Sequence, residues 1–145
     1  MTTPSSNERP QVGDVIAFRY VWSYEKQKRG RYPRPCLVVH VEESGTVVKV
    51  MVVPISSKKP AAGTGIELSA TALKILGLTK PSLIVATEAN ETSWPGYYLE
   101  PVPPGVVPAG PDWRYGRVGP VMLDAVAAII DAQDLAGLFP VTDRN

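Results

Sequence analysis

Two valine-rich runs that follow each other closely constrain the fold of this chain more than any other feature. Residues 36–41 and 47–53 are almost continuously apolar, and a short polar segment that ends in Gly45 separates them. Runs of this length, rich in β-branched side chains and joined by a short connection with a glycine, predict a β-hairpin. Because the runs are continuously apolar rather than alternating, we expect both faces of the hairpin to be covered.

Several further segments have the composition of strands. Residues 15–22 combine β-branched and aromatic side chains, and residues 82–87 form another apolar run. Residues 66–68 and 97–99 are shorter candidates of the same kind. Together with the hairpin, these segments predict a mainly β fold.

Two helices are expected among the strands. Ser69 can cap a short helix over residues 70–76, and Gly77 suits its C-terminal end. Pro120 suits the first position of a second helix that continues over residues 121–135, where apolar residues recur on one helical face. This C-terminal helix should pack that face on the sheet.

Length and composition indicate one domain. A chain of 145 residues with 44% hydrophobic content can bury a core of its own, and 15 prolines and 12 glycines favour short elements over a helical bundle. We divide it into a flexible N-terminal tail (1–11), a single domain (12–138) and a C-terminal tail (139–145). Within the domain, residues 101–111 are too rich in proline and glycine for regular structure and are expected to form a meander.

Composition also excludes some kinds of site. Cys36 is the only cysteine and His40 the only histidine, so we expect neither an internal disulfide nor a zinc site built from Cys and His. No metal or other cofactor is predicted. Neither a signal peptide nor an apolar stretch long enough to span a bilayer is visible, so we expect a cytoplasmic protein with no membrane partner.

A basic segment interrupts an otherwise balanced chain. The formal net charge is only +1, yet five cations lie close together with Glu25 as the only acid beside them: Lys26, Lys28, Arg29, Arg31 and Arg34. Tyr24 and Tyr32 are interleaved with these cations. Such a mixture can neutralise phosphates while aromatic rings stack on single-stranded bases. A solvated loop whose charges only keep it in water explains the composition equally well.

Hydroxyl groups follow the second valine-rich run. Pro54 is expected to end that strand, and Ser56, Ser57 and Lys58 come shortly after it. Hydroxyls beside a cation can hold a phosphate oxygen or a reacting ribose hydroxyl. An ordinary serine-rich turn that satisfies loose backbone groups is the alternative.

Two carboxylates follow the last apolar strand. Glu88 and Glu91 lie in a polar stretch that ends at Trp94 and is interpreted as a loop, where either is a candidate general base or specificity contact. A charged loop with Trp94 packed on the domain edge is the alternative. Cys36 is expected to be a buried apolar residue rather than a nucleophile, and His40 to be packed or exposed rather than catalytic.

The order of these features resembles the MazF/PemK toxin family. That family begins with a Gly-Asp strand, carries Arg-Pro before an apolar strand, and ends its third strand in Pro-x-Thr/Ser-Thr/Ser. The corresponding residues here are Gly13-Asp14-Val15-Ile16, Glu25-x-Gln27, Arg34-Pro35 before Cys36-Leu37-Val38-Val39, and Val52-Val53-Pro54-Ile55-Ser56-Ser57. The resemblance spans residues 12–132, and its motifs are more specific in the first half.

The resemblance implies a fold and an activity. Members of the family are small SH3-like β-barrels that form homodimers, cut single-stranded RNA without a metal, and are silenced by a small acidic antitoxin. It implies that Arg34 stabilises the charge of the phosphorane, that Ser56 takes the place of a catalytic threonine, and that Glu25 assists. With the basic segment, it suggests RNA contacts by Lys26, Lys28, Arg29, Arg31, Tyr24, Tyr32, Ser57 and Lys58.

Two other functions are compatible with the sequence. One is a non-catalytic toxin of the same architecture that inhibits DNA gyrase, as the related CcdB toxins do. Such a protein has no need of phosphate-stabilising groups at Arg34 and Ser56. The other is a nucleic-acid-binding barrel that uses the basic segment to bind without cutting.

Overall fold

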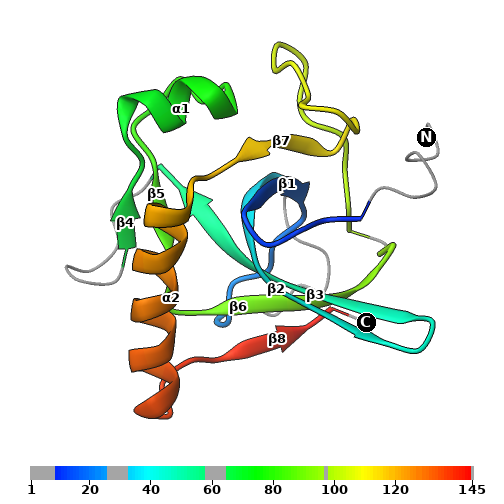
Figure 1. Cartoon of the computed structure of the whole chain (residues 1–145), viewed down its shortest axis with the longest axis vertical. Coiled ribbons are helices and arrows are strands. Elements are labelled where there is room, and N and C mark those ends of the chain that lie inside the picture. Colours follow the sequence, from blue (N-terminus) through cyan, green and yellow to red (C-terminus); the bar gives the residue numbers. More distant parts are fainter. Residues whose placement is uncertain (1–8, 26–32, 58–64, 97, 145) are drawn as a thin grey trace.

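The computed structural model describes residues 9–25, 33–57, 65–96 and 98–144. Within these ranges the chain forms eight strands and two helices around one sheet (Figure 1). The strands are β1 (Asp14–Phe18), β2 (Arg34–Ser44), β3 (Val47–Ser56), β4 (Gly65–Glu67), β5 (Leu83–Val85), β6 (Ala89–Trp94), β7 (Arg114–Arg117) and β8 (Val141–Asp143), and the helices are α1 (Ala70–Leu76) and α2 (Pro120–Leu135). The predicted mainly β fold with an internal and a C-terminal helix is confirmed.

The long strand β3 organises the sheet. It pairs with β2 along one edge, and along its other edge first with β6 and then with β5. β4 extends the sheet beyond β5, and β1 and β7 extend it beyond β2, so the main order is β4-β5-β3-β2-β1-β7. β8 pairs parallel with β6, and every other pairing among the described strands is antiparallel.

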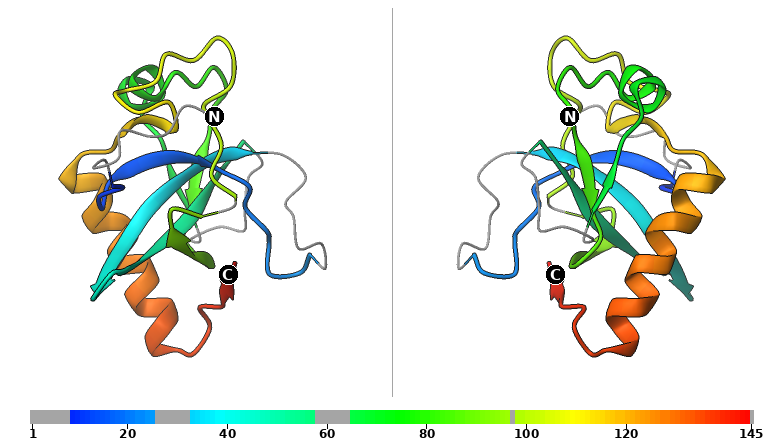
Figure 2. Two further views of the ribbon diagram at one scale, coloured as in Figure 1. Left: turned by 90° about the vertical axis from the view of Figure 1, so that its right-hand side faces the viewer. Right: turned by 90° about the vertical axis from the view of Figure 1, so that its left-hand side faces the viewer.

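Apolar side chains cover both faces of the sheet, as the valine-rich runs predict. One face carries a core to which both helices contribute, with Leu76 of α1 and Val126 of α2 in the same buried cluster as Leu37 of β2. Figure 2 shows α2 running along one side of the strands. The other face carries a second core, in which Val48, Val50 and Val52 of β3 pack with Val38 and with aromatic rings such as Trp113.

Both helices form where the sequence predicts them. The Ser69 side chain accepts a hydrogen bond from the N–H of Ala72, and Gly77 ends α1 in the left-handed conformation, with φ of 68°. Pro120 opens α2, where its missing N–H leaves no helical hydrogen bond unmade. Neither helix in the described part of the chain is long and apolar enough to cross a membrane.

The hairpin strands extend further than predicted, and β2 does so at both of its ends, reaching Ser44. β2 begins at Arg34, and β3 continues past Pro54 to Ser56. Pro54 falls between the stretch of β3 that pairs with β6, which ends at Val52, and the stretch that pairs with β5, which begins at Ile55. A residue without an N–H is tolerated at such a change of partner. The prediction that Pro54 ends the strand is therefore wrong.

Three strands, β6, β7 and β8, form where the sequence does not predict them, and two predicted strands are shorter. β6 occupies the stretch interpreted as a polar loop. The sequence does not predict this strand because two of its buried residues, Asn90 and Thr92, are polar, so the usual alternation of apolar and polar residues is missing. β7 is short and forms by pairing with β1, which is distant in sequence. The first strand ends at Phe18 instead of residue 22, and the strand predicted over residues 82–87 is β5, which covers Leu83–Val85. In the strand predicted over residues 97–99, Leu99 makes an isolated bridge to Phe18.

The segment expected to be a C-terminal tail, residues 139–145, contains β8. Its pairing with β6 is continued by a hydrogen bond from the N–H of Arg144 to the carbonyl of Glu91. The guanidinium carbon of Arg144 lies 3.8 Å from the centroid of the Tyr98 ring, and the group donates to the carbonyl of Arg19. The end of the described chain is therefore an integral part of the fold.

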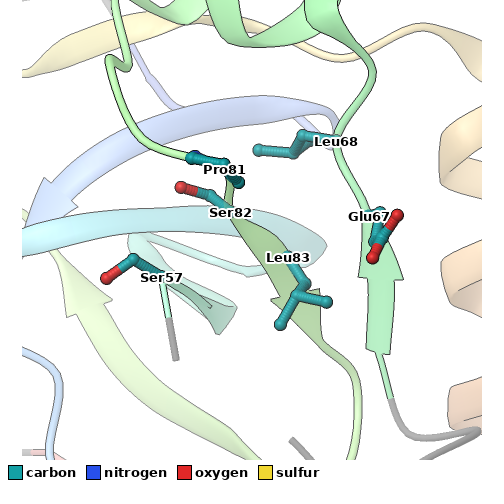
Figure 3. A pocket seen from close by; sticks show the side chains of 6 residues that line it. All are labelled: Ser57, Glu67, Leu68, Pro81, Ser82 and Leu83. Carbon is teal, nitrogen blue, oxygen red and sulfur yellow. The ribbon is translucent and has the colours of Figure 1, made fainter. Parts of the chain in front are cut away.

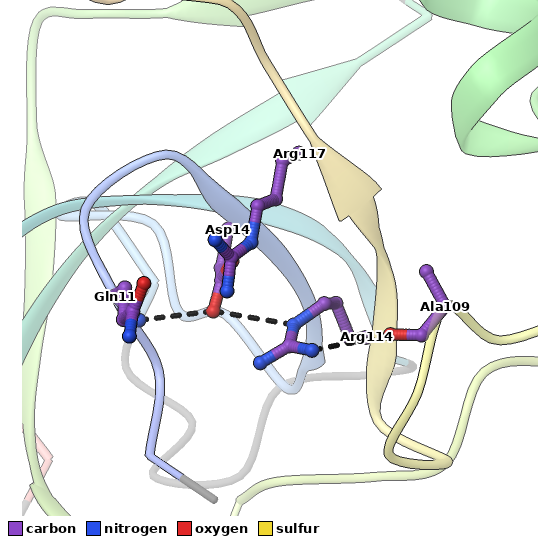
Figure 4. Close-up of polar contacts among 5 residues, drawn as sticks. All are labelled: Gln11, Asp14, Ala109, Arg114 and Arg117. Atoms are coloured by element: carbon purple, nitrogen blue, oxygen red, sulfur yellow. Dashed lines mark hydrogen bonds and ion pairs between the residues drawn. The ribbon is translucent and has the colours of Figure 1, made fainter.

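A buried carboxylate ties β1 to the proline-rich meander (Figure 4). Asp14 is fully buried, and its oxygens lie 3.3 Å from Nε of Arg114 and 2.7 Å from Nε of Arg117. It also accepts a hydrogen bond from the N–H of Gln11. Arg114 donates to the carbonyl of Ala109 inside the meander, which has no regular structure, as predicted. We call Asp14, Arg114 and Arg117 the Asp14 cluster.

Candidate functional site

Arg34 and Ser56 lie on neighbouring strands at the same end of the sheet. β2 and β3 pair antiparallel with Cys36 opposite Pro54. Continuing this register places Arg34, the first residue of β2, opposite Ser56, the last residue of β3. Directly opposed residues of an antiparallel pair have Cβ atoms about 5 Å apart on the same face. The two residues to which the resemblance assigns the chemistry are therefore neighbours.

The same row continues across two further strands. Ser56 pairs with Leu83 of β5, and Leu83 pairs with Glu67 of β4. A line of side chains thus crosses four strands, and we call it the cross-strand row: Arg34, Ser56, Leu83 and Glu67. The adjacent line on β3, β5 and β4 packs in the helix-covered core and consists of Ile55, Ile84 and Ile66. Since side chains alternate along a strand, the cross-strand row faces away from that core.

A hollow of about 290 Å³ opens over the Arg34 end of the row. Arg34 and Lys80 supply positive charge to it, and its other lining residues are hydroxyl-bearing or apolar: Ser56, Ser57, Thr79, Ser82, Pro33, Pro35, Ile55 and Leu78. None of the lining residues in the described ranges carries a carboxylate. Cations and hydroxyl donors on a concave surface suit an anion such as phosphate. We call this the Arg34 hollow.

A second hollow, of about 200 Å³, adjoins the first at the Glu67 end of the row (Figure 3). The two hollows share Ser57 and Ser82 in their linings. Figure 3 shows Ser57 on one side and Glu67 on the other, with Ser82 and Leu83 between them. The remaining lining is apolar and consists of Leu68 and Pro81. We call this the Glu67 hollow.

Aromatic rings lie beside Arg34 on the side of the basic segment. The guanidinium carbon of Arg34 is 5.3 Å from the centroid of the Trp22 ring. Trp22 in turn stacks on Tyr24, with 6.2 Å between centroids and 16° between the ring planes. Tyr24 is 77% exposed, so much of its ring is accessible to a further planar group. Trp22 restrains the Arg34 side chain by cation–π contact and connects it to Tyr24, a predicted stacking residue.

Glu25, the third residue predicted to take part in catalysis, holds a turn. Its carboxylate accepts a hydrogen bond of 3.0 Å from the N–H of Trp22, and its own N–H donates to the Trp22 carbonyl. It does not belong to the described lining of the Arg34 hollow. This geometry fits a residue that positions the Trp22 and Tyr24 rings.

Glu88 is a buried acceptor, contrary to the interpretation of its segment as a polar loop. It accepts hydrogen bonds from the Tyr20 hydroxyl at 3.0 Å and from the N–H and hydroxyl of Ser23 at 2.8 and 3.0 Å. Burial raises the pKa of Tyr20, and the Glu88 carboxylate raises it further. Asn90 accepts from the N–H of Val21 and donates to its carbonyl. This Glu88 network holds the chain before the basic segment, so Glu88 is a structural residue.

The other candidates from the sequence do not belong to the cross-strand row. Glu91 forms an ion pair with Lys49 on β3, with 3.9 Å between the charged atoms. Cys36 is fully buried, as predicted, and burial raises the pKa of its thiol. His40 is exposed on β2, roughly 20 Å along the strand from Arg34.

Several predicted RNA contacts fall outside the described residues: Lys26, Lys28, Arg29, Arg31, Tyr32 and Lys58. Within the described ranges, no group of three or more His, Cys, Asp and Glu side chains could hold a metal ion. Three residues at the site were not singled out from the sequence, namely Trp22, Glu67 and Lys80. Each looks like an ordinary strand-edge or surface residue in the sequence, and only the tertiary fold brings them together.

Compared with protein-family models and with curated proteins, the chain gives no match. The resemblance to the MazF/PemK toxins depends on the motifs quoted from the sequence. The site itself is defined by geometry, as a row of side chains with a cationic hollow at one end and a hollow bordered by a carboxylate at the other.

Proposed function

We propose that the protein is a sequence-selective endoribonuclease that cuts single-stranded RNA at the Arg34 hollow. The observation that supports this function most strongly is the position of Arg34 opposite Ser56 in a hollow that also contains Lys80. A guanidinium presents N–H donors in a plane and binds phosphate through two of them. A hydroxyl across from it adds a neutral donor, and the ammonium adds charge.

RNA brings its own nucleophile to such a site. The 2′-oxygen forms a bond to phosphorus, the bond from phosphorus to the 5′-oxygen breaks, and the products are a 2′,3′-cyclic phosphate and a 5′-hydroxyl. In the proposed reaction the 2′-hydroxyl loses its proton to water and the 5′-oxygen takes one from water. Arg34 and Lys80 stabilise the charge that develops on the phosphorane, and Ser56 donates a hydrogen bond to a non-bridging oxygen. Arginine keeps its proton at neutral pH, so Arg34 acts by charge and hydrogen bonding.

The proposal includes the assembly that the resemblance implies: an SH3-like barrel, a homodimer, and a small acidic antitoxin as partner. An acidic partner complements a surface where Arg34 and Lys80 carry the charge. The predicted contacts of the basic segment would lengthen this surface along the RNA backbone.

A protein that binds single-stranded nucleic acid without cutting it is the second candidate. It is favoured by the described lining of the Arg34 hollow, which includes neither a carboxylate nor an imidazole to accept a proton. Binding needs only the cations and the rings of Trp22 and Tyr24. An affinity that falls steeply with salt, without any RNA fragments, would identify this function.

Incubation of the purified protein with a long single-stranded RNA in EDTA tests the proposal. We expect discrete fragments that begin with a 5′-hydroxyl and end in a 2′,3′-cyclic phosphate, while DNA of the same sequence, which lacks the nucleophile, stays intact. RNA that is bound and not cut would reject the nuclease and leave the binding protein.

A further inference from the structure

We infer that the Glu67 hollow binds the base of a nucleotide adjacent to the scissile phosphate and selects guanine. The inference rests on the proposed function for the position of the phosphate, and it deepens that function because it names the residue that reads the RNA sequence. Its basis is the register of four strands and the composition of one hollow.

The cross-strand row fixes the distance between the two ends of the site. Neighbouring strands lie about 4.8 Å apart, so the backbone of Glu67 is about 10 Å from that of Ser56 and about 14 Å from that of Arg34. One nucleotide spans such a separation, from its phosphate to the far edge of its base. A phosphate held between Arg34 and Ser56 therefore presents a neighbouring base to the Glu67 hollow.

The Glu67 hollow has the size and surface for a single base. Its volume is about 200 Å³, and an apolar cavity of about 150 Å³ is enough to accept a benzene ring. Leu68, Pro81 and Leu83 supply apolar contacts for the faces of a ring. A mainly apolar lining with a few polar groups is the usual character of a small-molecule site.

Glu67 supplies the polar group that distinguishes one base from another. Its side chain is exposed, and among the residues that the structure describes no hydrogen-bond or ion-pair partner occupies it. A carboxylate accepts hydrogen bonds through two oxygens and donates none. Guanine offers two adjacent donors, N1–H and the N2 amino group, and matches both oxygens.

The other bases fit this group less well. Adenine and cytosine each offer one amino group beside an acceptor nitrogen, and uracil offers one N–H between two carbonyls, so the carboxylate meets acceptors as well as donors. The negative charge of Glu67 also directs the phosphate toward Arg34 and Lys80 at the other end of the row. Charge and hydrogen bonding together orient the nucleotide across the two hollows.

Binding of oligonucleotides that cannot be cut tests this inference with the full chain. The probes are short uridine oligomers with 2′-fluoro sugars, either all-uridine or with one central guanosine, inosine or adenosine, and the readout is fluorescence anisotropy. We expect the guanosine oligomer to bind roughly 5- to 150-fold more tightly than the all-uridine oligomer. Inosine, which lacks the N2 amino group, should fall between them, and adenosine should resemble uridine.

Two variants assign the preference to Glu67. Glu67→Ala should abolish the preference for guanosine and leave the affinity for the all-uridine oligomer at or above that of the unmodified protein. Glu42→Ala makes the same change of charge at an exposed position near the far end of β2, and it should keep the preference. Circular dichroism verifies that both variants are folded.

The outcomes separate the inference from the proposed nuclease. A guanosine preference that survives Glu67→Ala, or a protein that binds guanosine and uridine oligomers equally, overturns the inference even if RNA is cut. A preference that depends on Glu67, in a protein that leaves ordinary RNA intact, supports the base site and rejects the nuclease. A protein that binds none of the oligomers overturns the inference, and the cleavage assay in EDTA then decides the nuclease separately.

Discussion

The Asp14 cluster and the Arg34 hollow use cationic side chains in opposite ways. In the cluster, Arg114 and Arg117 share one fully buried carboxylate. In the hollow, Arg34 and Lys80 lie among hydroxyls, and no described lining residue is acidic. Exposure alone would not separate the two regions, because the Arg117 side chain is 52% exposed.

The chemistry of the surroundings therefore distinguishes a structural arginine from one that meets a ligand. An acid that is already buried beside two arginines offsets part of their charge within the fold. A concave surface that gathers cations without acids in its lining attracts an anion from solution. We expect changes in the cluster to affect stability, and changes in the hollow to affect ligand binding.

The largest effect on stability should come from Asp14→Ala. This change leaves two arginines beside a site that has lost its buried carboxylate, and it should lower the free energy of unfolding by about 3–5 kcal/mol in urea denaturation. Asp124→Ala, on the exposed side of α2, should change it by less than about 0.5 kcal/mol. Equal effects of the two substitutions would show that the Asp14 cluster does not hold β1 and β7 together.

Glu88→Ala should have a smaller effect on stability, together with an effect on RNA binding. The Tyr20 hydroxyl and two donors of Ser23 lose their acceptor, which should lower the free energy of unfolding by about 1–3 kcal/mol. RNA affinity should fall as well, because the same segment positions Trp22 beside Arg34. Glu91→Ala, on β6 just after Glu88, is the control. If it destabilises the protein as much, the Glu88 network has no special part in the fold.

Lys80→Ala should leave stability unchanged and weaken binding of all RNA sequences alike. Loss of one phosphate contact on a single strand should reduce the slope of log affinity against log salt by about 0.7. Lys74→Ala, an exposed lysine of α1, provides the comparison and should keep the slope of the unmodified protein. Identical slopes for the two variants would remove Lys80 from the ligand site.

Elements whose signals are local could be predicted from the sequence. Ser69 and Gly77 mark the two ends of α1, and Pro120 marks the start of α2, because capping depends on residues within one turn. The valine-rich hairpin was predictable for the same reason. β6 and β8 were not, because Asn90 of β6 is satisfied by the distant backbone of Val21 and β8 forms only against β6.

The candidate site could likewise be predicted from the sequence only in part. The motifs that resemble the toxin family pointed to Arg34 and Ser56. No pattern within the sequence predicts the register of β2 and β3 that places these two residues opposite each other. Glu67 and Lys80 carry no motif at all. They join the site through strand pairing and through the connection that follows α1, and both are tertiary features.

The rate of RNA cleavage by Arg34→Ala tests the central claim most directly. Single-turnover cleavage of a single-stranded RNA in EDTA would be measured for this variant and for Arg9→Ala, which removes an exposed arginine paired with Glu43. We predict that Arg34→Ala folds normally and cuts roughly 100- to 1,000-fold more slowly, because it loses a preorganised donor to the phosphorane, while Arg9→Ala keeps the full rate. A correctly folded Arg34→Ala protein that cuts RNA at the full rate would contradict the account.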